Sequence, residues 1–256
     1  MAASLNRTAF YASVRASLFD GRLKSSQVTG MDAILDAAPS LLGTTSLGYA
    51  LATTFHETAR TMQPIEEYGR GKGRSYGPTG FWGRGFVQLT WETNYAKATT
   101  RLRQLGLLRA GEDLVKTPKL AMRLDLAAPI LFVGMAEGWF TGKKLADYFG
   151  GGRYDPVGAR RIINGTDKDE LIAGQCGKFV DALRAAGHSV IPAASPPLPS
   201  ADETQAGLSL TNADPLNAKP APTGGLLRSG VQATGGAVRS GLAGLYDLIH
   251  ASFRKG

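Results

Sequence analysis

The segment 55–95 constrains this chain more than any other, because a helical pattern ends inside it and a stretch that cannot be helical follows. Leu47, Leu51 and Phe55 recur at four-residue spacing, which predicts a helix with an apolar face. Pro64 lies shortly after the sequence His-Glu-Thr and cannot continue that helix. The chain can therefore turn there and bring the residues that follow back across the helix end.

Glu57 lies in the last turn of the predicted helix. One turn earlier on the same face are Ala50, Thr53 and Thr54, whose small side chains are expected to leave open space beside the carboxyl group. Partial desolvation would keep this group protonated near neutral pH, so that it can donate a proton. We therefore predict that Glu57 is the general acid of a cleft that binds a sugar polymer.

A second carboxyl group is needed for that chemistry. Inverting glycosidases place two carboxyl groups about 6.5–9.5 Å apart and hold a water between them. Glu66 and Glu67 follow Pro64 and can lie across the cleft from Glu57. Neighbours in an extended segment point to opposite sides, so one of the two is expected to face the cleft. We favour Glu67 as an ionised, solvated base, and Glu66 is the alternative.

The stretch 68–86 contains seven glycines and four basic residues, a composition too flexible for a helix. We expect a loop or a short β-hairpin that lines the cleft. Tyr76, Phe81 and Trp82 lie within it, and their rings could stack on sugar rings. Trp82 is the preferred stacking residue.

Apolar residues recur at helical spacing through much of the remaining chain, whereas strand-like alternation is scarce. This pattern predicts two helices in residues 6–38, one in 88–105, two in 120–149 and a final one in 170–186. We therefore expect a mainly α fold over residues 1–189, with a small hairpin at the cleft.

Three motifs in order along the chain extend the argument: they read HETARTMQPIEE, GRGFVQLTWETNY and RRIINGT. Together they resemble glycoside hydrolase family 19, the chitinase-like family, and most closely its phage and prophage endolysin branch. The resemblance covers about residues 5–187. It implies a lysozyme-like α+β fold with the cleft beside the hairpin. The chain departs from plant chitinases in a shorter interval between acid and base and in the absence of their disulfide cysteines.

The resemblance also implies roles for individual residues. Glu57 matches the general acid of the family, and Glu67 is the best match for the base. Gln88 and Thr90 match the residues that bind sugar and orient the catalytic water, so Thr90 is counted with the catalytic group. Further contacts with the substrate are expected from His56, Thr58, Tyr76, Trp82, Asn94 and Asn164.

The expected activity is that of an endolysin: hydrolysis, with inversion, of β-1,4 links between N-acetylated amino sugars of bacterial peptidoglycan. A monomer that needs no cofactor and no metal is expected. Two alternatives stay open, a chitinase acting on chitin oligomers and a cell-wall binding module without activity. The joint presence of Glu57, Gln88, Thr90 and Asn164 argues against the second.

The charge of the chain agrees with an anionic partner. Before residue 190 there are 24 Lys and Arg residues against 17 Asp and Glu residues, which accounts for most of the net charge of +8. Such an excess attracts anionic polymers such as peptidoglycan. Nucleic acid would also suit it, but the sequence has no zinc-finger spacing, RNP signature or concentrated basic run, so no nucleic-acid partner is expected.

Other classes of hydrolase are disfavoured by missing residues. His56-Glu57 begins like the HExxH motif of zinc proteases, but Arg60 stands where the second histidine is required. A Ser-His-Asp hydrolase would need a GxSxG turn, which the sequence lacks. Cys176 is the single cysteine and is expected to be a small buried apolar residue, in a protein made in a reducing compartment.

The first 19 residues lack the charged start and long apolar run of a secretion signal, and no segment reaches the ~20 apolar residues of a membrane span. We therefore expect a protein made in the cytoplasm, the host cytoplasm if it is phage-encoded. It would reach the cell wall after release by a holin-type protein.

Residues 190–223 are rich in Pro, Ala and Ser and predict an extended linker after the catalytic domain. Residues 224–256 form a Gly-rich basic tail with an eleven-residue repeat. On a helical wheel its apolar residues gather on one face: Val231, Val238, Leu242, Leu245, Ile249 and Phe253. This amphipathic helix is expected to contact an anionic membrane. The alternative is a helix docked on the protein's own domain, or a frayed end.

Overall fold

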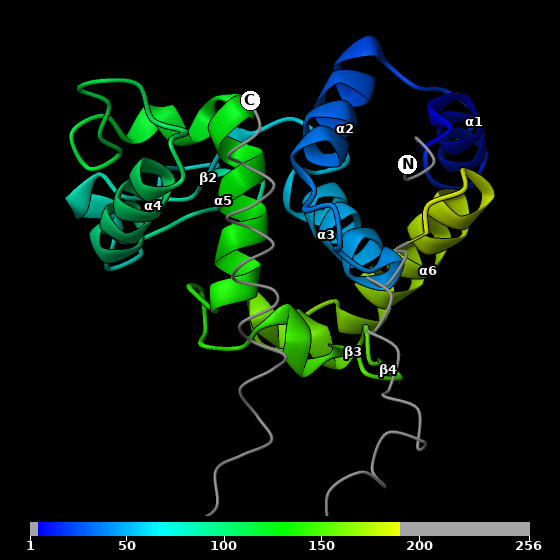
Figure 1. The fold of residues 1–256 in the computed structure, drawn as a ribbon. Helices are drawn as coiled ribbons and strands as arrows, with labels where there is room; N and C mark the ends of the chain where they lie inside the picture. The colour runs from blue at the N-terminus through cyan, green and yellow to red at the C-terminus, as the bar shows by residue number, and fades with distance from the viewer. Residues whose placement is uncertain (1–4, 190–256) are drawn as a thin grey trace, which may run out of the picture.

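Residues 5–189 are described by a computed structural model of the protein, and they form a mainly helical fold with two small antiparallel strand pairs (Figure 1). The mainly α prediction is thus confirmed. The α-helices have these bounds: α1 (Arg7–Leu18), α2 (Ser25–Ala37), α3 (Thr44–Glu57), α4 (Glu92–Gln104), α5 (Leu124–Glu137) and α6 (Asp169–Ala185). The strands are β1 (Ile65–Glu66), β2 (Arg84–Gly85), β3 (Phe149–Gly150) and β4 (Arg153–Tyr154). The 3₁₀ helices are η1 (Gly77–Thr79), η2 (Pro118–Met122), η3 (Leu145–Asp147) and η4 (Gly158–Ile162).

Helix α5 stands between two groups of elements (Figure 1). On one side α1, α2, α3 and α6 pack together, with α6 in contact with both α1 and α3. On the other side lie α4 and the loops around it. Because α5 contacts both α2 and α4, it joins the two groups. Its residues 126–136 are all buried, as expected for a helix in that position.

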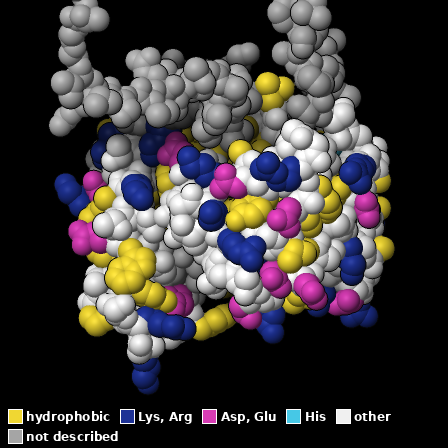
Figure 2. Space-filling model, turned by 90° about the horizontal axis from the view of Figure 1, so that it is seen from below, with side chains coloured by type: hydrophobic (Ala, Val, Ile, Leu, Met, Phe, Trp, Pro, Cys, Tyr) yellow, Lys and Arg dark blue, Asp and Glu magenta, His cyan; other side chains and the backbone are white. Residues whose placement is uncertain are grey.

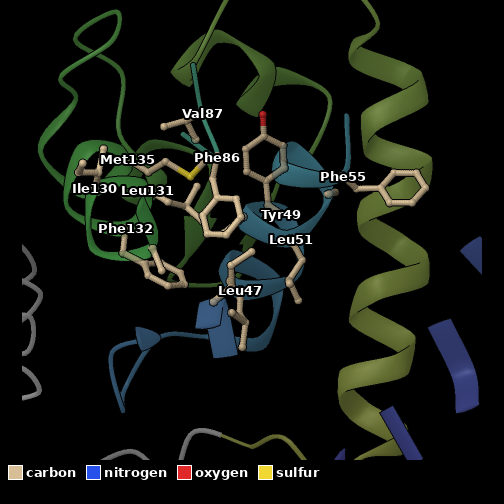
Figure 3. Packing of buried hydrophobic residues seen from close by; sticks show 14 of the residues in the cluster. Leu47, Tyr49, Leu51, Phe55, Phe86, Val87, Ile130, Leu131, Phe132 and Met135 are labelled. Carbon is tan, nitrogen blue, oxygen red and sulfur yellow. The ribbon is translucent and has the colours of Figure 1, made fainter. Parts of the chain in front are cut away.

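Helix α3 is also enclosed, since every residue from Ser46 to Phe55 is buried. Figure 3 shows Tyr49 on the side of α3 that carries Phe86 and the apolar side chains of α5, whereas Phe55 points toward α6. The rings of Phe55 and Phe179 meet edge to face there, with their centroids 6.0 Å apart. A helix that is apolar on all sides belongs in the core of a domain.

The expectation that small side chains of α3 leave open space beside the carboxyl group of Glu57 was wrong. Ala50, Thr53 and Thr54 are fully buried, because α3 is covered on the face that these small side chains occupy. Their size allows neighbouring elements to pack closely against α3. Any opening beside Glu57 therefore comes from residues beyond the helix end.

The strand pair β1–β2 is the small hairpin that the sequence predicts. Ile65 pairs with Gly85 and Glu66 with Arg84 in antiparallel register. Residues 67–83 connect the two strands and include the glycine-rich stretch. The second pair, β3–β4, was not expected; Phe149 pairs with Tyr154 around a tight glycine turn.

Two helix predictions needed correction. The helix expected from residue 88 begins at Glu92, because Gln88 and Trp91 have φ angles of 53° and 69°, which are not helical. The second helix expected in residues 120–149 is a single 3₁₀ turn. Gly138, with φ of 75°, ends α5 in the left-handed conformation. The two helices expected in residues 6–38 and the final helix are present.

The linker 190–223 and the amphipathic tail 224–256 lie outside the described residues, so their predictions stay predictions. Within residues 5–189, no helix combines the length and the apolar character that crossing a bilayer requires.

Gly48 permits the close contact between α3 and α6, and its replacement tests that contact. A Cβ atom at Gly48 would lie 2.5 Å from Val180 Cγ2 and 3.2 Å from the Val180 backbone nitrogen. We expect Gly48→Val to lower the free energy of unfolding by about 1–3 kcal/mol through overpacking, measured by urea denaturation. Gly174→Val, on α6 with open space around it, is the matched control and should change stability by less than about 0.5 kcal/mol. Equal effects of the two substitutions would contradict this account of the α3–α6 contact.

Candidate active site

Glu57 is the last residue of α3, and the turn that follows is fixed by hydrogen bonds. The hydroxyl of Thr58 donates to the carbonyl of Thr54 at 2.7 Å and accepts from the backbone N–H of Met62 at 3.1 Å. Arg60 follows with a positive φ of 67°, so the helix cannot continue. Local structure therefore places Glu57 where the buried helix reaches the surface.

Arg160 is the partner of Glu57. Its Nη1 lies 2.6 Å from Glu57 Oε1, and its Nε donates to the carbonyl of Asp167 at 2.9 Å. The Arg160 side chain is 3% exposed and that of Glu57 is 16% exposed. No described residue donates a hydrogen bond to the second carboxyl oxygen, Glu57 Oε2. The ion pair thus fixes one carboxyl oxygen and leaves the other without a hydrogen bond from the described protein.

Glu57 lines a cleft of about 730 Å³. Among the described residues that line it, Glu57 is the single carboxyl group, and the others are mostly neutral polar, basic or aromatic. The lining residues are Glu57, Arg74, Tyr76, Val87, Gln88, Thr90, Trp91, Asn94, Phe140, Thr141, Lys143, Arg161, Ile163, Asn164 and Gly165. Six predicted site residues are therefore brought together: Glu57, Tyr76, Gln88, Thr90, Asn94 and Asn164.

Arg84 holds the wall of the cleft that residues 65–95 form. Its side chain is only 4% exposed. Nε donates to Glu66 Oε1 at 3.0 Å, and Nη1 donates to the hydroxyl of Tyr95 at 3.0 Å and to the carbonyl of Gly80 at 3.0 Å. The guanidinium also lies 4.4 Å from the centre of the Trp82 ring. One buried cation thus ties β1, β2, the glycine-rich loop and α4 together.

Glu66 belongs to this structural network. Its Oε1 accepts from Trp82 Nε1 at 2.8 Å as well as from Arg84, and its Oε2 lies 3.4 Å from Arg70 Nε. The hydrogen bond from Trp82 and the Arg84 guanidinium hold the pKa of Glu66 below its usual range, although desolvation acts in the opposite direction. Glu66 does not line the cleft.

Glu67 lies one layer behind the lining of the cleft. Its Oε1 accepts from the hydroxyl of Tyr76 at 2.9 Å, and its Oε2 accepts from the backbone N–H of Gly83 at 2.9 Å. Tyr76 itself lines the cleft, whereas Glu67 does not. Of the two candidate bases, Glu67 is thus the one whose carboxylate contacts a lining residue. The preference for Glu67 over Glu66 as base stays a prediction.

The sequence from Gln88 to Asn94 supplies four lining residues because its backbone is irregular. Gln88 Nε2 donates to the carbonyl of Ile65 at 3.1 Å, which fixes the amide group. A Cβ atom at Gly83 would lie 2.7 Å from Gln88 Oε1, so only glycine leaves room there. Asn94 Nδ2 donates to the carbonyl of Thr90 at 3.1 Å. Both amide side chains keep their oxygen atoms for other partners.

The tryptophan that lines the cleft is not the one that the sequence analysis preferred. Trp82 lies between Arg84 and Arg70 and does not line the cleft. Trp91 lines it instead, is 45% exposed, and meets the ring of Tyr76 edge to face at 5.4 Å. Aromatic character alone could not separate Trp82 from Trp91. The buried Arg84 packs on the face of Trp82, so that face is not available to a sugar ring.

The two residues that flank Glu57 do not line the cleft. Thr58 is fully buried, and its hydroxyl is used in the turn, so its predicted contact with substrate does not fit this structure. His56 is half-buried on a different face of α3 from Glu57, because consecutive helical residues diverge by about 100°. Burial lowers the pKa of His56, which favours the neutral imidazole.

The other side of the cleft comes from residues far along the chain. Asn164 follows η4, and its backbone N–H donates to the carbonyl of Arg160 at 3.0 Å. Arg160 and Arg161 are adjacent, yet Arg160 is buried against Glu57 while Arg161 is exposed in the cleft. The sequence analysis missed both arginines, together with Lys143 and Arg74. The RRIINGT motif was the available signal for the first two.

No cluster of three or more His, Cys, Asp or Glu side chains that could hold a metal ion occurs in the described part of the chain. Cys176 is buried on α6, as expected. Burial raises the pKa of its thiol to about 12, so it stays protonated and unreactive at neutral pH.

Comparison with known proteins gives no relative: no family model, no curated protein and no solved structure matches this chain. The resemblance to glycoside hydrolase family 19 therefore stays an inference from its three motifs.

Glu66 gives a prediction about pH. The ionised carboxylate stabilises the folded state above its unfolded pKa of about 4.5, and that contribution is lost as pH falls through the lowered folded pKa. We expect Glu66→Gln to lower the free energy of unfolding by about 1–3 kcal/mol at pH 7, since the buried Arg84 loses its counter-charge. The difference should shrink toward zero below pH 4 in parallel urea titrations. A difference that stays constant with pH would contradict this role.

Proposed function

We propose that the protein is a glycoside hydrolase that cuts β-1,4 links between N-acetylated amino sugars with inversion, acting on bacterial peptidoglycan as an endolysin does. The lysozyme-like fold implied by the motif resemblance belongs to the same proposal. The observation that carries it is the cleft itself. One partly exposed carboxyl group, Glu57, faces a set of neutral polar side chains drawn from separate segments: Gln88, Thr90, Asn94 and Asn164.

This lining suits a neutral sugar ring. Hydroxyl and N-acetyl groups are recognised by amide and hydroxyl side chains, each of which can donate and accept hydrogen bonds. Trp91 and Tyr76 add apolar ring surface against which the face of a sugar can pack. A cleft of about 730 Å³ has room for several sugar rings along an extended polymer.

In the proposed reaction, the proton of Glu57 passes to the glycosidic oxygen while the bond from that oxygen to the anomeric carbon breaks. A water molecule attacks the anomeric carbon from the opposite face and gives its proton to Glu67. Gln88 and Thr90 hold that water. Attack from the opposite face inverts the configuration at the anomeric carbon.

Arg160 favours this direction of proton transfer. As the proton leaves Glu57, negative charge develops on a carboxyl group whose Oε1 lies 2.6 Å from a buried guanidinium. The attraction is therefore stronger in the transition state than while Glu57 carries its proton, which is the condition for catalysis. The hydrogen bond from Arg160 also fixes the orientation of the carboxyl group.

Glu67 as base depends on its link to Tyr76. In this structure Tyr76 lines the cleft, and its hydroxyl donates to the carboxylate of Glu67. In the proposed mechanism, substrate that packs against Trp91 and Tyr76 moves the Tyr76 ring, which is in edge-to-face contact with the ring of Trp91. The proposal requires this movement to open a path for water to Glu67.

Replacement of the acid is the first test. Glu57→Gln keeps the side-chain shape and an oxygen for Arg160 but removes the counter-charge of that buried arginine. We expect at least a 10²-fold loss of peptidoglycan hydrolysis under conditions in which circular dichroism shows the variant to be folded. Release of reducing ends from purified cell walls measures the loss. Mass spectrometry of the products identifies the bond that is cut and separates peptidoglycan hydrolysis from chitin hydrolysis. Full activity of the Gln variant would rule out Glu57 as acid.

The second test compares the two neighbouring carboxylates. Glu67→Gln should lower kcat about 10²–10⁴-fold with little loss of stability, since its partners Tyr76 and Gly83 are neutral. Glu66→Gln should behave in the opposite manner and lose stability while keeping most of its kcat, because its partners are Trp82 and the buried Arg84. Rates and urea midpoints measured on the same preparations separate the two effects. An inactive, stable Glu66→Gln variant beside an active Glu67→Gln variant would reverse the assignment.

A further inference from the structure

We propose that Arg74, Lys143 and Arg161 form a cationic rim of the cleft that recognises carboxylate groups carried by the sugar polymer. This inference rests on the proposed function for the identity of the polymer. Under this proposal, these three side chains make the cleft bind an anionic amino-sugar polymer more tightly than a neutral one.

All three rim side chains are exposed and line the same cleft as Glu57. They come from three separate segments: the glycine-rich loop, the loop after α5, and η4. None of them forms an ion pair with another described residue, whereas Arg84, Arg101 and Arg123 are each paired with a carboxylate. The rim cations are therefore available to a ligand.

The charge of the lining is strongly one-sided. Glu57 is its single carboxyl group among the described residues, and that group is already in contact with Arg160. The rim thus adds three positive charges that no lining residue balances. Figure 2 shows Lys and Arg side chains interspersed with Asp and Glu on the face it presents. Unbalanced charge in a cleft attracts a ligand of opposite sign.

Two of the rim residues are held in a defined relation to each other. The hydroxyl of Thr141 donates to the carbonyls of Arg161 and Ile162, which ties the loop that carries Lys143 to η4. Arg161 directly follows Arg160, whose burial against Glu57 fixes the backbone of η4. Lys143 and Arg161 therefore have a set position relative to the carboxyl group that is proposed to act as acid.

Chitin and peptidoglycan differ in whether they carry carboxylates that the rim could bind. Chitin is built from N-acetylglucosamine alone and carries no carboxylate. Peptidoglycan carries a lactyl group on alternate sugars, which bears either a free carboxylate or a peptide with its own carboxylates. The rim would bind these groups beside the sugar that occupies the cleft. Because exposed charge pairs are each weak, the three residues together should matter more than any one of them.

The experiment measures binding by full-length protein in the Glu57→Gln background, so that the polymer stays intact. The probes are soluble peptidoglycan glycan strands and the same strands after carbodiimide coupling of their carboxylates to a neutral amine. We expect Arg74→Gln, Lys143→Gln and Arg161→Gln together to weaken binding of the charged strands about tenfold at low salt. Binding of the neutralised strands should change less than about twofold. Raising the salt concentration should weaken binding of the parent more than that of the triple variant.

A matched control carries the same loss of charge away from the cleft. Lys116→Gln, Lys119→Gln and Lys178→Gln together remove three exposed charges that do not line it. We expect this control to bind charged strands like the parent. An equal loss in the control, equal binding of both strand types by the parent, or unchanged binding by the rim variant would each overturn the proposal. Failure of the proposed function would be seen separately, because the protein with Glu57 intact would release no reducing ends. The binding comparison would still show whether the three rim residues recognise carboxylates.

Discussion

A helix that is buried on all sides can present a functional group to solvent only at its ends, and α3 is such a helix. Its residues from Ser46 to Phe55 are enclosed, so its polar chemistry is confined to the final turn, where Glu57 lies. The turn after it is fixed by Thr58, and the partner of Glu57 comes from η4. Every other wall of the cleft is arranged around this point. The core therefore does more than stabilise the domain, since it sets the position and direction of the single carboxyl group in the described lining.

Two buried arginines, Arg84 and Arg160, hold different parts of the cleft wall in place. Arg84 organises the loop between β1 and α4 by pairing with Glu66 and by packing on Trp82. Arg160 joins the end of α3 to the segment that carries Asn164. A buried cation without a partner is costly, so each arginine requires its carboxylate as much as the carboxylate requires it. What separates the two carboxylates paired with these arginines is position, since Glu57 lines the cleft and Glu66 does not. Glu67 contacts the phenol of Tyr76, which lines the cleft, and a backbone N–H.

Under the proposed function, the distribution of charge assigns bond cleavage and choice of polymer to different residues of one cleft. Neutral amides and hydroxyls lie near Glu57 and suit the sugar backbone that all amino-sugar polymers share. The exposed cations Arg74, Lys143 and Arg161 line the same cleft. In the proposal they bind carboxylate groups attached to the sugar backbone. In this scheme bond cleavage and choice of polymer depend on different residues. Either could therefore change in evolution or by design while the other is kept.

The sequence by itself determined the helical class, the end of α3 before Pro64, the hairpin and six of the fifteen described residues that line the cleft. Helical periodicity and the limits on backbone angles are local properties, so the class and the element boundaries could be read from it. It also predicted Glu57, Gln88, Thr90, Asn94 and Asn164 as one group through their motifs. Only the tertiary structure decided that Arg160, 103 residues away, pairs with Glu57, and that Trp91 rather than Trp82 reaches the cleft. It likewise enclosed the small residues of α3 that were expected to border open space. These outcomes depend on which distant side chain occupies a given volume, and close packing of segments far apart in the chain settles that question where local preference cannot.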